Sequence, residues 1–179
     1  MDMTGEERIA ARRDAVWAAL NDVNVLRQCI PGCELLEKTS DTDMAAKVKL
    51  QIGPVRATFT GKVALSDIDP PNGYRISGEG QGGVAGYAKG GAVVRLVEDG
   101  GGTLLKYEAK ADVGGKLAQL GGRLIDSTAR KLAGDFFQKF GEVVGASAGA
   151  PPSAAPVRKE GWLRRLWRRL FGRSPSWQP

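Results

Sequence analysis

The sequence contains no histidine and only two cysteines, Cys29 and Cys33, among its 179 residues. Without histidine, the chain lacks the usual general base, the Ser-His-Asp and Cys-His arrangements, and the commonest ligand of zinc, copper and non-haem iron. Two cysteines with no partner ligands nearby make neither a disulfide framework nor a metal site, so we interpret them as buried or spare thiols. These absences argue against most classes of enzyme.

Long apolar runs are also missing. No stretch reaches the roughly 18 apolar residues of a membrane-spanning helix, and the charged residues 1–13 do not resemble a signal peptide. We therefore expect a cytoplasmic protein that reaches the membrane from inside. The G-x-G-x-x-G pattern at residues 78–83 is followed by a continuing strand rather than a helix, so it predicts no dinucleotide site.

Alternating apolar and polar residues, separated by turn sequences such as residues 69–73 and 98–102, predict an antiparallel meander. Its strands are expected at residues 3–9, 46–52, 57–65, 74–78, 84–97 and 103–113. Apolar residues at helical spacing predict helices at residues 13–21, 23–28 and 116–144. The fold class is therefore α+β, with a curved antiparallel sheet wrapped around one long C-terminal helix.

Small residues crowd one region of this expected sheet, where glycine lowers strand stability and so needs a reason. Seven glycines fall within residues 78–91. One explanation is tight packing of the long helix on the sheet. The other, which we favour, is an apolar ligand pocket lined by Phe59, Val63, Ile76, Tyr87, Leu117, Leu120, Gly121, Leu124 and Phe136. A polar contact to an apolar ligand is expected from Tyr74, Tyr87 or Tyr107.

The positive charge of the chain belongs to its C-terminal tail. The whole chain has 26 basic and 20 acidic residues, and residues 151–179 hold seven of the basic and one of the acidic ones. Residues 1–150 are therefore neutral, which argues against a nucleic-acid surface on the folded domain. Three parts follow: a domain at 1–145, a Pro/Ala/Gly-rich flexible linker at 146–157 and a basic tail at 158–179.

Residues 162–171 form the most amphipathic stretch of the tail. On a helical wheel one half is apolar, with Trp162, Leu163, Leu166, Trp167, Leu170 and Phe171, and the other is cationic, with Arg164, Arg165, Arg168 and Arg169. Ten residues span only about 15 Å as a helix, too short to cross a bilayer. We expect this helix to lie on an anionic membrane surface. The alternatives are docking on its own domain or a partner protein, or binding nucleic acid.

Three segments together resemble a known family. They are residues 29–34 (Cys-Ile-Pro-Gly-Cys-Glu), residues 53–61 (Gly-Pro-Val-Arg-Ala-Thr-Phe-Thr-Gly) and the glycine-rich residues 78–91. Over about residues 1–145 the chain is similar to the G subunit of carbon monoxide dehydrogenase, a family of the START-like (SRPBCC) helix-grip superfamily. The resemblance implies a non-catalytic accessory protein that ties a molybdenum-containing carbon monoxide dehydrogenase, or a related hydroxylase, to the membrane where respiratory quinone is reduced.

Two mechanisms fit these expectations. In the first, the domain carries respiratory quinone (ubiquinone or menaquinone) between the inner membrane and the dehydrogenase, and has no covalent cofactor or catalytic residue. In the second, it is a ligand-free adaptor that recruits the dehydrogenase to the membrane. A START-like enzyme such as a cyclase is a third class, which the absence of histidine disfavours. Either mechanism expects peripheral attachment to the cytoplasmic face of the inner membrane through the tail.

Removing residues 151–179 is expected to abolish binding to anionic vesicles, because the excess cations and the apolar helix face are removed together. Co-sedimentation of the full chain and of a chain ending at residue 150 measures this. Binding of the full chain should also weaken as salt rises. Equal sedimentation of the two chains would contradict the membrane interpretation.

Overall fold

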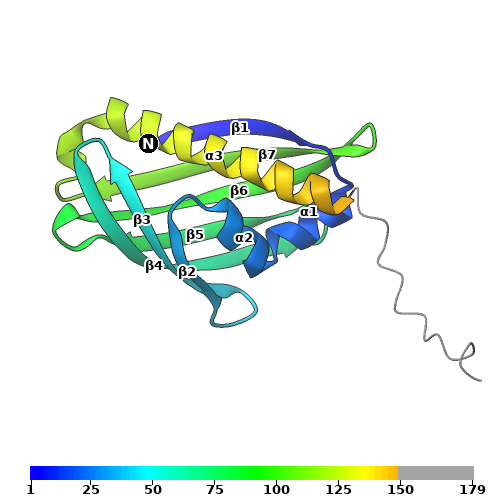
Figure 1. Ribbon diagram of the computed structural model, residues 1–179, viewed down its shortest axis with the longest axis horizontal. Coiled ribbons are helices and arrows are strands. Elements are labelled where there is room, and N and C mark those ends of the chain that lie inside the picture. The colour runs from blue at the N-terminus through cyan, green and yellow to red at the C-terminus, as the bar shows by residue number, and fades with distance from the viewer. Residues whose placement is uncertain (149–179) are drawn as a thin grey trace, which may run out of the picture. The chain divides into compact units, whose positions relative to one another are not determined.

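The computed structural model describes residues 1–148 as one antiparallel sheet with helices on its concave side (Figure 1). The strand order is β1-β7-β6-β5-β4-β3-β2. The elements, with η marking 3-10 helices, are β1 Asp2–Ile9, α1 Arg13–Leu20, α2 Val23–Cys29, β2 Cys33–Lys38, β3 Asp43–Ile52, β4 Val55–Asp69, β5 Gly73–Gln81, η1 Gly83–Ala85, β6 Tyr87–Asp99, β7 Gly102–Gly114, η2 Ala118–Leu120 and α3 Gly122–Ala148.

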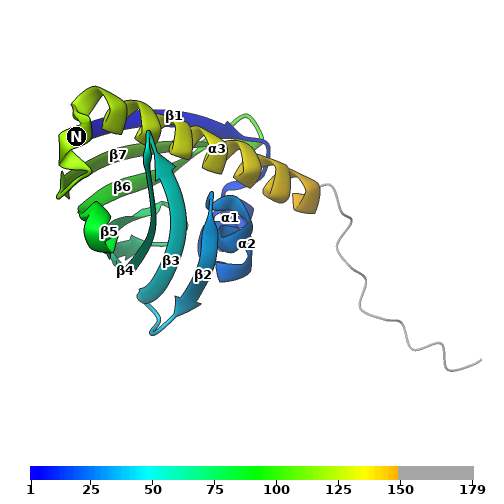
Figure 2. The same cartoon turned by 60° about the vertical axis from the view of Figure 1, so that its left-hand side comes forward.

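The long helix α3 lies across the curled sheet (Figures 1 and 2). Its 27 residues span about 40 Å at 1.5 Å per residue. It contacts β1 at one edge of the sheet and β3 near the other, and its C-terminal half packs on α1 and α2. The expected α+β architecture, a curved antiparallel sheet around a long C-terminal helix, is confirmed.

Two glycines allow the sheet to curl sharply. A Cβ atom on Gly61 of β4 would collide with the carbonyl oxygen of Glu79 on β5, and one on Gly90 of β6 would collide with the carbonyl oxygen of Lys110 on β7. The neighbouring backbone approaches these positions so closely that only glycine fits. Part of the glycine enrichment therefore serves curvature.

The structure differs from the sequence-based prediction at three elements. Residues 83–85 form the short 3-10 helix η1, so the strand expected at 84–97 begins only at Tyr87, and the glycine-rich residues 78–83 are not followed directly by a strand. Residues 33–38 form the edge strand β2, which has no clear period-two pattern and was not predicted. The long helix begins at Gly122 rather than at residue 116, because Gly121 adopts a positive φ of 85° that ends the preceding 3-10 turn. The apolar residues 117–120 therefore belong to a connecting segment and not to α3.

The core lies beneath the C-terminal half of α3. Phe140 and Val144 of α3 are buried with Val16 and Leu20 of α1 and with Leu105 of β7. Phe140 stacks on Phe136, with ring centroids 5.7 Å apart. The other end of the sheet carries no comparable cluster among the described residues, and this asymmetry leaves space under the helix.

Among residues 1–148, no helix is long and apolar enough to cross a membrane. Helix α3 continues through residues 146–148, the first three of the expected linker. The rest of the linker and the tail, with the predicted membrane-binding helix at 162–171, lie outside the described residues. The predictions for that region stay predictions.

The Phe140→Ala variant is expected to lose about 3–5 kcal/mol of unfolding free energy, because Phe140 is fully buried where α3 grips the sheet. Lys139→Ala is the matched control, since its exposed ion pair with Glu142 contributes about 0.5 kcal/mol or less. Urea unfolding followed by circular dichroism measures both. Similar losses in the two variants would show that Phe140 does not hold the helix on the sheet.

Candidate ligand-binding site

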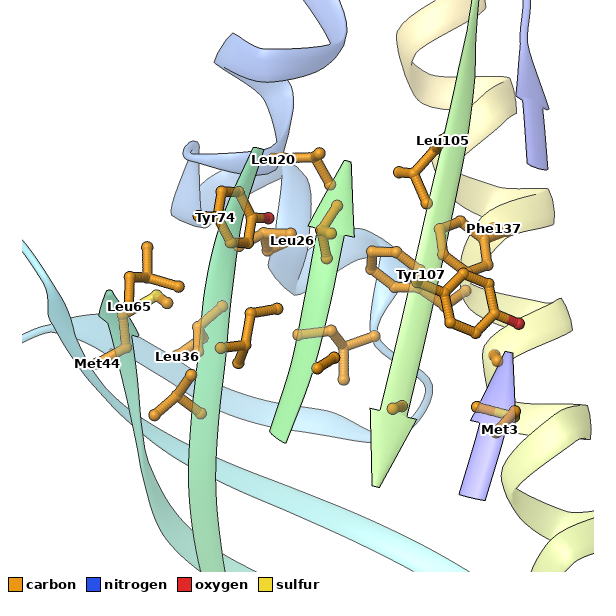
Figure 3. Close-up of a pocket in the computed structure, with 18 residues that line it drawn as sticks. Met3, Leu20, Leu26, Leu36, Met44, Leu65, Tyr74, Leu105, Tyr107 and Phe137 are labelled. Carbon is orange, nitrogen blue, oxygen red and sulfur yellow. The ribbon is translucent and has the colours of Figure 1, made fainter. Parts of the chain in front are cut away.

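A chamber of about 330 Å³ lies between the concave face of the sheet and α3 (Figure 3). Ala133, Phe136 and Phe137 of α3 form one wall, and Leu20 of α1 and Leu26 of α2 close one end. The sheet and the α2–β2 connection supply the remaining lining residues, which are Met3, Ile30, Leu36, Met44, Val63, Leu65, Tyr74, Ile76, Ala92, Val94, Leu105, Tyr107 and Ala109.

Two tyrosines carry the only side-chain oxygen or nitrogen atoms in this lining. Tyr74 on β5 is only 6% exposed, and its ring packs edge-on against Trp17 of α1 at 5.5 Å. Tyr107 on β7 stacks on Phe137, with centroids 5.2 Å apart. Burial raises the pKa of the Tyr74 phenol far above its usual value, and burial with the nearby Glu7 carboxylate raises the pKa of Tyr107. Both side chains are therefore neutral hydroxyls near neutral pH.

The chamber continues into a more open trough of about 380 Å³. The two spaces share Val63, Ile76, Ala92 and Ala109. The floor of the trough consists mainly of small residues, which are Ala46, Gly61, Gly78, Gly80, Ala88, Gly90, Gly91 and Ala111. These positions have little or no side chain to fill the space between sheet and helix, so the expected apolar volume is present.

Strand β5 follows both spaces from one end to the other. Tyr74, Ile76, Gly78 and Gly80 alternate along one face of the strand, with Tyr74 in the chamber and Gly80 in the trough. Six residues at 3.3 Å each place these two positions about 20 Å apart. The binding space is therefore an elongated channel with bulky apolar walls at one end and glycine and alanine at the other.

Four of the predicted pocket residues line these spaces. Val63, Ile76 and Phe136 line the chamber, and Phe59 lines the trough. Their contact with a ligand stays a prediction.

The other five lie outside the lining of both spaces, and their contact with a ligand also stays a prediction. Tyr87 is 46% exposed because odd-numbered positions of β6 face away from the chamber. Leu117 is buried in the connecting segment, where its N–H donates to the Ala85 carbonyl. Leu120 and Gly121 precede α3, and Leu124 packs over Gly53 in the β3–β4 turn.

Sequence reasoning missed the wall formed by α1 and α2, which includes Leu20, Leu26 and Ile30. Nothing in a local pattern shows which part of the sheet a short helix will cover. The alternation of strands β4 and β7 could have identified three further lining residues, Leu65, Leu105 and Ala109. Each lies an even number of positions from a residue of its own strand that faces inward. Cys29 and Cys33 are free thiols away from the chamber lining, as interpreted from the sequence.

A curled seven-stranded sheet that holds a long C-terminal helix over an apolar chamber defines a START-like, helix-grip domain. The family model for the G subunit of carbon monoxide dehydrogenase (CoxG) matches residues 5–145. The chain belongs to the CoxG family, as the sequence resemblance predicted.

Solved structures agree with this assignment. A conserved protein from Geobacillus kaustophilus is 30% identical, with a TM-score of 0.78 over 82% of this chain and 97% of that one. A protein from Thermus thermophilus is 13% identical (TM-score 0.64; 83% of this chain, 100% of that one). An aromatase/cyclase from a Streptomyces species is also 13% identical (TM-score 0.59; 84% and 96%). The last two show the fold alone. No curated protein matches the sequence significantly.

Filling the trough is expected to block binding of apolar molecules without unfolding the domain. A Cβ at Gly80 would meet only Phe59 Cβ at 3.7 Å, an ordinary contact, so Gly80→Leu places its side chain in open space. We expect the affinity for Nile red to fall by about tenfold or more, equivalent to at least about 1.4 kcal/mol.

Fluorescence titration measures the affinity, and thermal melting checks the fold. Ser77→Leu is the matched control because Ser77 lies on the opposite face of the same strand, outside the lining of both spaces. Unchanged saturable binding in Gly80→Leu would show that the dye does not use this channel. Loss of binding in both variants would also contradict the assignment.

Proposed function

We propose that this protein is a non-catalytic quinone carrier that serves a molybdenum-containing carbon monoxide dehydrogenase or a related hydroxylase. Membership of the CoxG family supports an accessory role beside that enzyme. The apolar chamber of about 330 Å³ beneath α3 is the observation that carries the proposal. The carrier takes quinone from the membrane, presents it to the dehydrogenase and returns the quinol, while the dehydrogenase performs the redox chemistry.

The chemistry of the chamber suits an isoprenoid quinone. Such a molecule is almost insoluble in water, and an apolar lining lowers the free-energy cost of lifting it out of the bilayer. The volume of about 330 Å³ is at the lower end of the range for small-molecule sites, so it suits a ring with a short length of chain. The adjoining trough offers about 380 Å³ for more of the chain.

The tail gives the carrier a means of staying close to its source of quinone. The basic, amphipathic residues 162–171 are suited to an anionic membrane surface. The predicted linker allows a tethered domain to turn between the bilayer and the dehydrogenase. We propose that the tail binds the cytoplasmic face of the inner membrane.

The two alternatives receive less support. A ligand-free adaptor needs no open volume in its interior, whereas the chamber and trough are open. A cyclase would be consistent with the fold of the Streptomyces aromatase/cyclase. Its chemistry needs groups that exchange protons, but the described chamber lining has no carboxylate, amine or imidazole, and its two phenols have raised pKa values. The charged side chains that line the binding space, Lys62, Glu79, Lys89 and Lys110, belong to the open trough and not to the chamber.

Quinone is expected to co-purify with the full chain extracted from native membranes, and to pass into quinone-free vesicles added afterwards. Lipid extraction followed by mass spectrometry quantifies both steps. Gly80→Leu, purified in the same way, should carry about tenfold less quinone, and Ser77→Leu should match the wild type. Absence of bound quinone, together with no uptake from quinone-loaded vesicles, would contradict the carrier and leave the adaptor.

A further inference from the structure

Among the described residues, Tyr74 brings a side-chain polar atom, its hydroxyl oxygen, to the closed end of the chamber, where it is set among Leu20, Leu26 and other apolar side chains (Figure 3). We propose that this hydroxyl donates a hydrogen bond to an acceptor oxygen on the ligand ring, so that the ring lies at the closed end and the chain leaves through the glycine-lined trough. This inference rests on the proposed function, because it assigns an orientation to the quinone in that chamber.

The Tyr74 hydroxyl makes no hydrogen bond within residues 1–148, and burial alone accounts for its raised pKa. The residue as a whole is only 6% exposed, and its oxygen points into the chamber in Figure 3. The oxygen is not among the fully enclosed side-chain atoms that lack a partner, so it remains accessible from the chamber. A hydroxyl in apolar surroundings gains from a hydrogen-bond partner, and a ligand oxygen in the chamber would supply the acceptor.

Tyr107, the other tyrosine in the lining, lies in a different environment. Its hydroxyl lies against Gly5 of β1 and points away from the middle of the chamber (Figure 3). The charges of Glu7 and Arg130 act on it, so its environment is polar. Tyr107 therefore contributes mainly its ring, which stacks on Phe137. Nothing in the sequence favoured one of these two tyrosines, but in the structure the Tyr74 hydroxyl points into the chamber, whereas the Tyr107 hydroxyl lies against Gly5.

The channel has a closed end and an open end. Leu20 and Leu26 close the end beside Tyr74, and Trp17 packs against the Tyr74 ring. At the other end, about 20 Å along β5, Gly80 and Ala88 leave the trough open. A ligand with a polar ring and a long apolar chain brings its ring oxygen to Tyr74 only by entering ring first. The open end then lets a chain of any length extend beyond the protein.

The protonated state of Tyr74 fixes the chemical class of the partner oxygen. A phenol whose pKa is raised stays protonated and donates its hydrogen to an acceptor. The carbonyl oxygen of an oxidised quinone can only accept a hydrogen bond, so it is a suitable partner for the Tyr74 hydroxyl as donor. A hydrocarbon of the same shape offers no acceptor and gains nothing from Tyr74. The assignment therefore predicts selectivity for ring carbonyls over bare aromatic rings.

The test compares two small ligands, menadione, which has ring carbonyls, and 2-methylnaphthalene, which has the same ring system without them. Equilibrium dialysis gives the affinity of each for the full chain, for Tyr74→Phe and for the control Tyr87→Phe, a tyrosine that is 46% exposed and lies outside the lining of both spaces. Tyr74→Phe should bind menadione about 5- to 30-fold more weakly than wild type and bind 2-methylnaphthalene as well as wild type. Tyr87→Phe should match wild type for both.

Thermal melting without ligand accompanies this comparison. Because Tyr74→Phe removes a hydroxyl that makes no hydrogen bond within residues 1–148, its melting temperature should stay close to that of wild type. An unchanged menadione affinity in Tyr74→Phe, with both ligands still bound, would overturn the Tyr74 assignment alone. An equal loss of affinity for both ligands would show a packing role and overturn it too. Failure of wild type to bind either ligand would overturn the proposed function and this inference together.

Discussion

The structure depends on a separation between the sheet and the helix that crosses it. Gly61 and Gly90 let the sheet curl where neighbouring backbone leaves no room for a Cβ atom. Phe136 and Phe140 hold α3 on the sheet at its C-terminal half. Between these two constraints, small residues such as Ala92 leave volume that no side chain fills. The chamber is thus a consequence of curvature at one place and tight packing at another.

The chamber is an apolar environment with the Tyr74 hydroxyl at its closed end. Its lining offers almost no polar atoms, so it suits an apolar molecule and gives little help to acid–base chemistry. Tyr74 is the exception at the closed end. An apolar site with few polar groups is suited to holding a ligand reversibly, and this is consistent with an accessory role for a member of the CoxG family.

Much of the fold could be predicted because its signals are local. Alternation marked most strands, and helical spacing marked α3. The glycines around residues 78–91 indicated open volume, and the position of Val63 and Ile76 on the chamber side of their strands follows from strand parity, which is a local property. The wall formed by α1 and α2, and the start of α3 after Gly121, depend on tertiary packing. For the same reason the sequence could not separate Tyr74 from the other two tyrosines.

The central claim is that the chamber stays open and holds an apolar molecule with its ring beside Tyr74. A crystal structure of the full chain, purified from native membranes with its bound lipid retained, tests this most directly. The account predicts density for a ring within hydrogen-bonding distance of the Tyr74 hydroxyl, continuing as a chain past Gly78 and Gly80. A chamber filled by Phe136 and Phe137, with α3 closed onto the sheet and no ligand density, would contradict it.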